Sequence, residues 1–193
     1  MLRGMERHRG FTLIEILVTI TIMVILMTLG VASLRGTQVR ARDEDRRNDA
    51  ENITRHLDSQ YAKGYSFPFD STTVTQRGSY PTTAQFTDSA ARAAIFEYLP
   101  AAVLIAPNNT NSDDSIFAAI NDIETTSGVL PSPEANGAYV YQPISDVAIA
   151  NPEGSPATTK LCIDYLLQTC RRFNLYYHSE TTGAIYVIKS RDR

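Results

Sequence analysis

Glu15 is the residue whose setting most clearly calls for a chemical role. It is the single ionisable residue in the apolar run FTLIEILVTITIMVILMTLGVASL, residues 11–34. An acidic side chain in a membrane helix costs about 2.5–3.5 kcal/mol at mid-bilayer, and less near the interface, so it is a functional hypothesis by default. The chemistry that this carboxylate offers is pairing with a positive group, because a paired charge in lipid is much less costly than an unpaired one.

Residues typical of enzyme active sites are scarce elsewhere in the chain. The 193 residues, about one domain by length, include three His, two Cys and no Trp. No HExxH, GxSxG, P-loop or paired CxxC pattern occurs. The 18 Lys+Arg and 21 Asp+Glu residues leave a net charge of −3, which gives no reason to expect a general nucleic-acid binder. We therefore predict a protein that is not an enzyme and that uses no cofactor.

The apolar run itself is predicted to be a membrane helix. At 1.5 Å per residue, a helix of this length spans about 36 Å, enough to cross a bilayer core of about 30 Å. A secretory signal peptide would have an apolar core of only about 7–15 residues and would end in a small-residue cleavage site, which this run lacks. A plain signal anchor fits the hydropathy equally well. Glu15 is the residue that separates a plain anchor from a membrane helix with a further function.

A short basic segment, MLRGMERHRG, precedes the apolar run and ends in Gly10. The sequence GFTLIE that begins at Gly10 resembles the prepilin signature of type IV pilins and of the pseudopilins of type II secretion and competence systems. The resemblance implies that a prepilin peptidase cuts between Gly10 and Phe11 and methylates the new Phe11 amine. Glu15 can then pair with the Phe11 amine of a neighbouring subunit during docking; the alternative is that its side chain reaches the lipid headgroups and has no role.

The resemblance and the composition together divide the chain into four segments. They are a leader peptide, a transmembrane and assembly helix, an amphipathic continuation of that helix, and a globular head, at residues 1–10, 11–34, 35–64 and 65–193. Basic residues flank the span on both sides, so the positive-inside rule is ambiguous. The resemblance, and not the charge count, places the head outside the cytoplasm. It implies a single-pass protein of the cytoplasmic membrane that ends in an extracellular pilus or a periplasmic pseudopilus.

The helix is predicted to continue to residue 63. Residues 35–63 contain no proline and are rich in residues that suit an exposed helix. Ile53, Leu57 and Tyr61 recur every four residues and form an apolar stripe that could pack against the head. Gly64 is the candidate C-cap.

Two features inside this helix leave alternatives open. The charged stretch at residues 40–51, in which Asp43 and Arg47 are spaced for an ion pair, is either a solvated face or a set of salt bridges between filament subunits. Gly30 marks either a point of unwinding in a filament or a close helix contact.

The head is predicted to have an α+β fold. The segment GSYPTT, residues 78–83, looks like the G-x-YPT stretch that follows the first helix in many pilins. We expect an antiparallel sheet packed on the long helix, which is the type IV pilin fold. The expected elements are a loop over 65–85, helices from residue 87 or 88 to 99 and over 116–124, and strands over 138–142, 161–167, 173–178 and 184–189. Thr182-Gly183 is the expected turn between the last two strands.

Cys162 and Cys170 are the two cysteines. Export to an oxidising compartment favours a disulfide between them, which would contribute about 2–3 kcal/mol for so short a loop. The bond would then staple a hairpin between the second and third predicted strands. Two reduced, buried thiols are the alternative. No metal site is predicted, because the nearest histidine is His178.

The leading function is that of a structural subunit of a type IV pilus-like filament. The resemblance implies a homopolymer or a mixed filament with other pilins, and the prepilin peptidase, an inner-membrane assembly platform and membrane lipid as earlier partners. One alternative is a pseudopilin of type II secretion or DNA uptake, and another is a signal-anchored extracellular enzyme or binding protein. The basic cluster of Arg171, Arg172 and the tail does not firmly indicate nucleic acid, and we interpret it as a solvated surface.

Overall fold

A computed structural model of the chain describes residues 11–69, 72–107, 115–122, 138–150 and 158–191. The chain divides into two compact units, residues 1–40 and residues 41–193. Helix α1, Leu13–Lys63, forms the regular structure of the first unit and is also the first element of the second. The predicted leader, including Gly10, lies outside the described residues.

Helix α1 confirms the predicted long helix. It ends where the sequence indicates, because Gly64 adopts a left-handed φ of +88° and its N–H donates to the Gln60 carbonyl oxygen at 2.7 Å. The backbone is helical at Gly30 and at Gly36. Unwinding near Gly30 in a filament therefore stays a prediction about the assembled state.

The second unit continues with short helices and strands. The described elements after α1 are β1 (Tyr65–Phe69), β2 (Thr72–Gln76), α2 (Thr83–Thr87), α3 (Ser89–Ile95), the 3-10 helix η1 (Ala101–Leu104), β3 (Ile116–Ala118), β4 (Tyr139–Ala150), β5 (Thr158–Leu161), β6 (Cys170–His178) and β7 (Ile185–Lys189).

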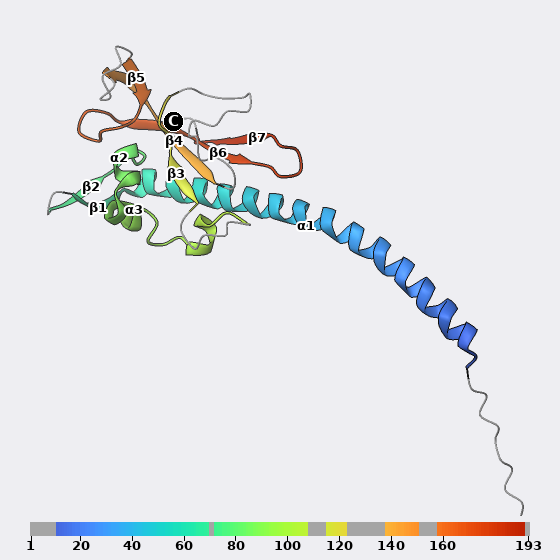
Figure 1. Cartoon of the computed structure of the whole chain (residues 1–193). Coiled ribbons are helices and arrows are strands. Elements are labelled where there is room, and N and C mark those ends of the chain that lie inside the picture. Colours follow the sequence, from blue (N-terminus) through green and yellow to red (C-terminus); the bar gives the residue numbers. More distant parts are fainter. Residues whose placement is uncertain (1–10, 70–71, 108–114, 123–137, 151–157, 192–193) are drawn as a thin grey trace, which may run out of the picture. The chain divides into compact units, whose positions relative to one another are not determined.

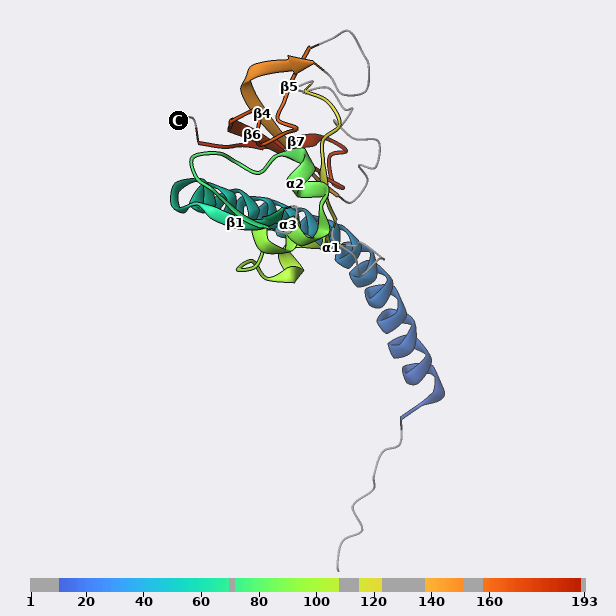
Figure 2. The same cartoon turned by 90° about the vertical axis from the view of Figure 1, so that its left-hand side faces the viewer.

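The strands form two sheets. β1 and β2 make an antiparallel hairpin, and the larger sheet has the order β3-β4-β6-β7, with β5 also paired to β4. β3 runs parallel to β4, while β5, β6 and β7 each join an antiparallel neighbour. In Figures 1 and 2 the larger sheet lies on one side of the carboxyl-terminal half of α1, and α3 and η1 lie on the other side. The α+β fold is confirmed, with one parallel pair added.

The core lies between α1 and the sheet. Ile53 and Leu57 of the predicted stripe are fully buried, and Tyr61 packs against the same cluster. Aromatic rings fill the space opposite, with centroids 4.8 Å apart for Tyr80 and Phe173. Such edge-on contacts add to the burial energy and fix how the rings fit together. The carboxyl-terminal half of α1 is therefore the central element of the head.

The segment GSYPTT ties α1 to the sheet. The Ser79 hydroxyl accepts from the Cys170 N–H at 2.9 Å, and the Tyr80 N–H donates to the Cys170 carbonyl at 2.9 Å. The Tyr80 hydroxyl donates to Asp58 of α1 at 2.6 Å, and Tyr141 donates to the Pro81 carbonyl at 2.8 Å. Polar groups of this segment thus form hydrogen bonds that connect α1 with the sheet.

The prediction of a loop over 65–85 is wrong. Its first part is the β1–β2 hairpin, and its last part begins α2. Thr82 caps α2 through a reciprocal pair of hydrogen bonds with Gln85, a capping box that the sequence T-x-x-Q contains. The next helix has the predicted Asp88 cap but ends at Ile95, before the predicted residue 99.

Three further boundaries differ from the prediction. Residues 116–118 are strand β3 and not helix, because they pair with the distant strand β4. The strand predicted over 161–167 ends at Leu161, and a turn follows. β4 extends far beyond residue 142. Pro143 is tolerated within it because its carbonyl accepts from the Cys162 N–H, while the Cys162 carbonyl accepts from the Thr83 N–H instead, so no donor is required from Pro143.

Candidate functional site

The carboxylate of Glu15 caps the start of its own helix. The Thr12 N–H and hydroxyl both donate to Glu15 Oε2, at 2.9 and 3.0 Å. The Glu15 N–H donates in turn to the Thr12 hydroxyl at 3.3 Å. This is the reciprocal capping box, which satisfies two backbone donors that a helix start otherwise leaves free. Because α1 begins at Leu13, Phe11 lies outside the helix, and its side chain is 83% exposed.

The rest of the first unit suits an apolar environment. The most apolar stretch of α1 is long enough to span a bilayer core, and none of it is buried within the chain. The hydroxyls of Thr19, Thr21 and Thr28 each donate to a carbonyl of their own helix, at 2.7–2.9 Å. Side-chain donors that bond within the helix add no unsatisfied polar group in lipid. The segment is long and apolar enough to cross a membrane.

Thr12 is the residue at this site that the sequence interpretation missed. The motif T-x-x-E, ahead of an apolar run, is a signature for the start of a helix and was present in the sequence. The structure joins Glu15 to Thr12, while Phe11 makes no described contact with Glu15 in the single chain. The predicted pairing of Glu15 with a neighbour's Phe11 concerns an assembled state and stays a prediction.

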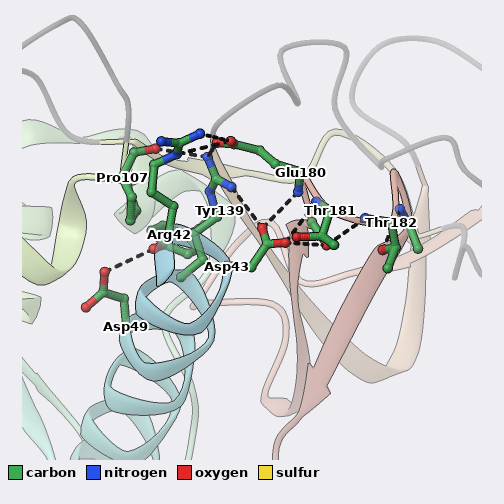
Figure 3. A network of polar contacts seen from close by, with 11 residues as sticks. Arg42, Asp43, Asp49, Pro107, Tyr139, Glu180, Thr181 and Thr182 are labelled. Atoms are coloured by element: carbon green, nitrogen blue, oxygen red, sulfur yellow. Dashed lines mark hydrogen bonds and ion pairs between the residues drawn. The ribbon is translucent and has the colours of Figure 1, made fainter. Parts of the chain in front are cut away.

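A second polar network fixes α1 to the turn between β6 and β7 (Figure 3). Asp43 accepts hydrogen bonds from the Ser179 hydroxyl and from the Glu180 and Thr181 N–H groups, at 2.8–2.9 Å. Glu180 points back at α1 and forms ion pairs with Arg42 and Arg46. We call these four residues of α1 and the turn, Arg42, Asp43, Arg46 and Glu180, the head lock.

Arg46 is the central cation of the head lock. Only 4% of the residue is exposed, and it also contacts Asp43 at 3.2 Å and the Pro107 carbonyl at 2.9 Å. A guanidinium buried to this extent requires charged or polar partners on several sides. The head lock therefore draws three segments together: α1, the chain after η1, and the β6–β7 turn.

The carboxylates of the head lock are held in their charged form. Burial would raise the pKa of Asp43, but hydrogen bonds from Thr181, Ser179 and Glu180 outweigh it and hold the pKa well below its ordinary value. The hydrogen bond from Arg42 is the main reason that the pKa of Glu180 is lowered, and Arg46 adds to it.

The predicted ion pair between Asp43 and Arg47 is wrong. Asp43 faces the head and pairs with Arg46, whereas Arg47 pairs with Glu51 at 3.3 Å, where the Arg47 side chain is exposed. Spacing alone could not decide between the two arginines, because both lie within helical reach of Asp43. No local signal marked Glu180, whose partners are more than 130 residues away in the chain.

The disulfide between Cys162 and Cys170 is present, with the two Cα atoms 5.7 Å apart. The prediction that it staples a hairpin is wrong, since β5 and β6 each pair with β4. The bond instead closes the loop between these strands. Among the described residues, no group of three or more His, Cys, Asp or Glu side chains is arranged to hold a metal ion.

Comparison with known proteins gives two matches. Residues 5–31 match the family model of the prokaryotic N-terminal methylation motif. The chain is 28% identical over 157 residues to the type II secretion system core protein G of Escherichia coli strain K12, which covers 81% of this chain and 90% of that protein. The predicted prepilin-type methylation motif is therefore confirmed, and the chain is similar over most of its length to a protein of type II secretion. No solved structure gives a significant match.

The two similarities cover the two sites described above. The family motif spans the capping box and most of the apolar part of α1, whereas the similarity to the secretion protein extends over most of the chain.

Proposed function

We propose that this chain is a prepilin that is cut between Gly10 and Phe11, methylated at the Phe11 amine and polymerised through α1. Before assembly, residues 11–34 anchor it in the cytoplasmic membrane, with the head of residues 65–193 outside the cytoplasm. The prepilin peptidase and the inner-membrane assembly platform act on it in turn. The chain itself has no catalytic role.

One observation carries the docking role of Glu15. The capping box uses Oε2 for both hydrogen bonds from Thr12, and within the described part of the chain no donor reaches Oε1. The carboxylate is thereby oriented at the start of α1 with one oxygen open to a further donor. The amine that cleavage creates at Phe11 of an incoming subunit is a cation that fits this position. Pairing removes the cost of two separate charges in lipid and favours the axial register in which the two groups meet.

The similarity to the secretion protein favours one form of this function. It extends over 81% of the chain, well past the methylation motif that all prepilins share, and thus includes the head. On this ground we propose a pseudopilin of a type II secretion system as the second candidate, beside a subunit of a surface pilus. The abundance of the chain in sheared surface filaments separates the two, because a major pilin dominates that fraction and a pseudopilin is scarce in it.

Substitutions at Glu15 test the docking role. Glu15→Gln keeps an acceptor for the capping box but removes the charge, and Glu15→Ala removes both. We expect both variants to insert in the membrane and to lose the leader, since cleavage depends on Gly10. Both should then remain as processed monomer, because the Phe11 amine lacks its counter-charge.

Fractionation into membrane and sheared-filament pools, with mass spectrometry of the amino terminus, gives the result. If Glu15→Gln assembles at the wild-type level when it is the only copy, the carboxylate acts as a helix cap and the docking role is wrong. An intact Met1 terminus in assembled wild-type protein would refute the processing step. Wild-type protein should instead begin at a methylated Phe11.

A further inference from the structure

An exposed apolar patch lies on the disulfide loop and the neighbouring bulge of β4. Val147, Leu166 and Leu167 are 59%, 70% and 66% exposed. Apolar side chains scattered singly on a surface are ordinary, but a group of large ones rimmed by charge is typical of an interaction site. Here the rim carries charges of both signs: the guanidinium groups of Arg171 and Arg172 lie 3.9 and 3.4 Å from the exposed carboxylate of Asp146.

The loop that carries the patch is held by several bonds within the subunit. The disulfide closes the loop, and the Asp164 carboxylate accepts from the Leu166 N–H at 2.8 Å. Gln168 is 4% exposed, and its amide donates to the carbonyl of Val147 and to that of Leu161, both at 3.2 Å. This glutamine holds the loop against the bulge of β4. Surfaces that are ordered in advance lose less entropy on binding and bind more tightly for their area.

A complementary surface lies on α1 of the same molecule. Ala41, Glu44, Asp45 and Asn48 are all exposed and follow the i, i+3, i+4, i+7 spacing of one helix face. We call these four residues the outer face of α1; they include two carboxylates, and the exposed Arg40 and Arg47 border them. Within the described part of the chain neither carboxylate forms an ion pair. The arginines at positions 42 and 46 point instead to the head lock.

We propose that the patch of Val147, Leu166, Leu167, Arg171 and Arg172 in one subunit docks on the outer face of α1 in a second copy of this chain. Two guanidinium groups that share one carboxylate in the free subunit would each gain a carboxylate, and the two leucines would be covered by the helix. This contact rests on the proposed filament function and names the lateral surfaces of that filament. Since the two surfaces differ, the contact is heterologous, and repeated contacts of this kind generate open helical assemblies.

The two surfaces cannot meet within one subunit. The Tyr139 hydroxyl contacts Asp49 of α1 at 3.2 Å, so the start of β4 lies beside the helix. Val147 is eight residues farther along the strand, or about 26 Å at 3.3 Å per residue. Figures 1 and 2 both show β5, which precedes the disulfide loop, on the side of the sheet away from α1. Any contact between the patch and residues 41–48 therefore comes from a second subunit.

Photo-crosslinking in assembled filaments tests the contact directly. A benzophenone amino acid at Leu167 of the full-length protein should crosslink subunits through peptides between Ala41 and Asn48. The same probe at Tyr98, which is 81% exposed, is the matched control and should not reach those peptides. Crosslinks from Leu167 that map elsewhere, or to a different protein or lipid, would overturn the proposal.

Reversing the charges on the two surfaces provides a second test, measured as the amount of sheared filament. Asp45→Arg and Arg171→Glu should each lower the amount of sheared filament about tenfold, because each places like charges together at the contact. The double variant restores the opposite signs and should regain most of the filament. Glu97→Arg makes the same charge change at another exposed position and should leave assembly unchanged.

Two results distinguish this contact from the proposed function itself. Wild-type protein that never forms filaments counts against the filament function. If the wild type forms filaments and both single variants assemble normally, the filament function stands and the contact is refuted. The same holds if the double variant assembles no better than the worse single variant. Protection of Cys162 and Cys170 from thiol labelling confirms in each variant that the head is folded.

Discussion

Removal of Glu180 is the sharpest test of the head lock. Glu180→Ala deprives Arg46, which is only 4% exposed, of one of its two carboxylates. Loss of one partner of a fully buried ion pair costs about 3–5 kcal/mol. Here the Glu180 side chain is 25% exposed, and Asp43 and the Pro107 carbonyl still contact the guanidinium. We therefore expect a loss of about 2 kcal/mol in the free energy of unfolding.

The measurement is thermal unfolding of a soluble segment comprising residues 41–193, the second compact unit. For a domain of this size, 2 kcal/mol corresponds to a fall of about 4–8 °C in Tm. Glu51→Ala is the matched control, since Glu51 also binds two arginines of α1, but their side chains are 60% and 67% exposed. Exposed pairs contribute about 0–1 kcal/mol. If Glu180→Ala lowers Tm no more than Glu51→Ala does, the head lock does not stabilise the fold.

Three further outcomes follow from the same unit. Folding lowers the pKa of Asp43, so its carboxylate stabilises the head above the ordinary pKa of 3.8, and this stabilisation is lost as the pH falls toward the folded-state pKa. Below about pH 4, the Tm of Asp43→Asn should therefore vary less with pH than the Tm of the wild type. Replacement of Cys162 and Cys170 by Ser should cost about 2–3 kcal/mol in urea unfolding, and a much smaller loss would contradict the loop-closure argument. Gly64→Ala should cost about 1–2 kcal/mol by the same assay, because φ is +88° and an added Cβ would lie 3.1 Å from the Gln76 carbonyl oxygen; an unchanged midpoint would refute this.

The parts of the fold that the sequence predicted well depend on local patterns. α1 was predicted because apolar composition, the four-residue stripe and Gly64 all lie within one continuous segment. The turn at Thr182-Gly183 was predicted from turn residues between two apolar runs, and Gly183 has a φ of +66°, which suits glycine best. In both cases a residue's neighbours in sequence are also its structural partners, so short-range physics decides the outcome.

The parts that were missed depend on distant partners. Residues 116–118 are too few to show a period, and their strand exists because β4 offers a free edge. The strand predicted over 138–142 stopped before Pro143, yet β4 continues through this residue because the Cys162 carbonyl opposite it takes its donor from Thr83. A pattern within a few residues cannot reveal which edge or register a segment will find.

The candidate site shows the same division. The position of Glu15 and the identity of its motif could be predicted from six consecutive residues, and its cap on Thr12 was present in the same six. The head lock could not be predicted, because Glu180 becomes a partner of Arg46 only after the sheet brings the β6–β7 turn to α1. Local preferences therefore favour α1 and the β6–β7 hairpin, whereas the charges that join them can pair only in the folded head. A subunit with an intact amino-terminal motif and a broken head lock should still be processed, while its head should be the first part to unfold.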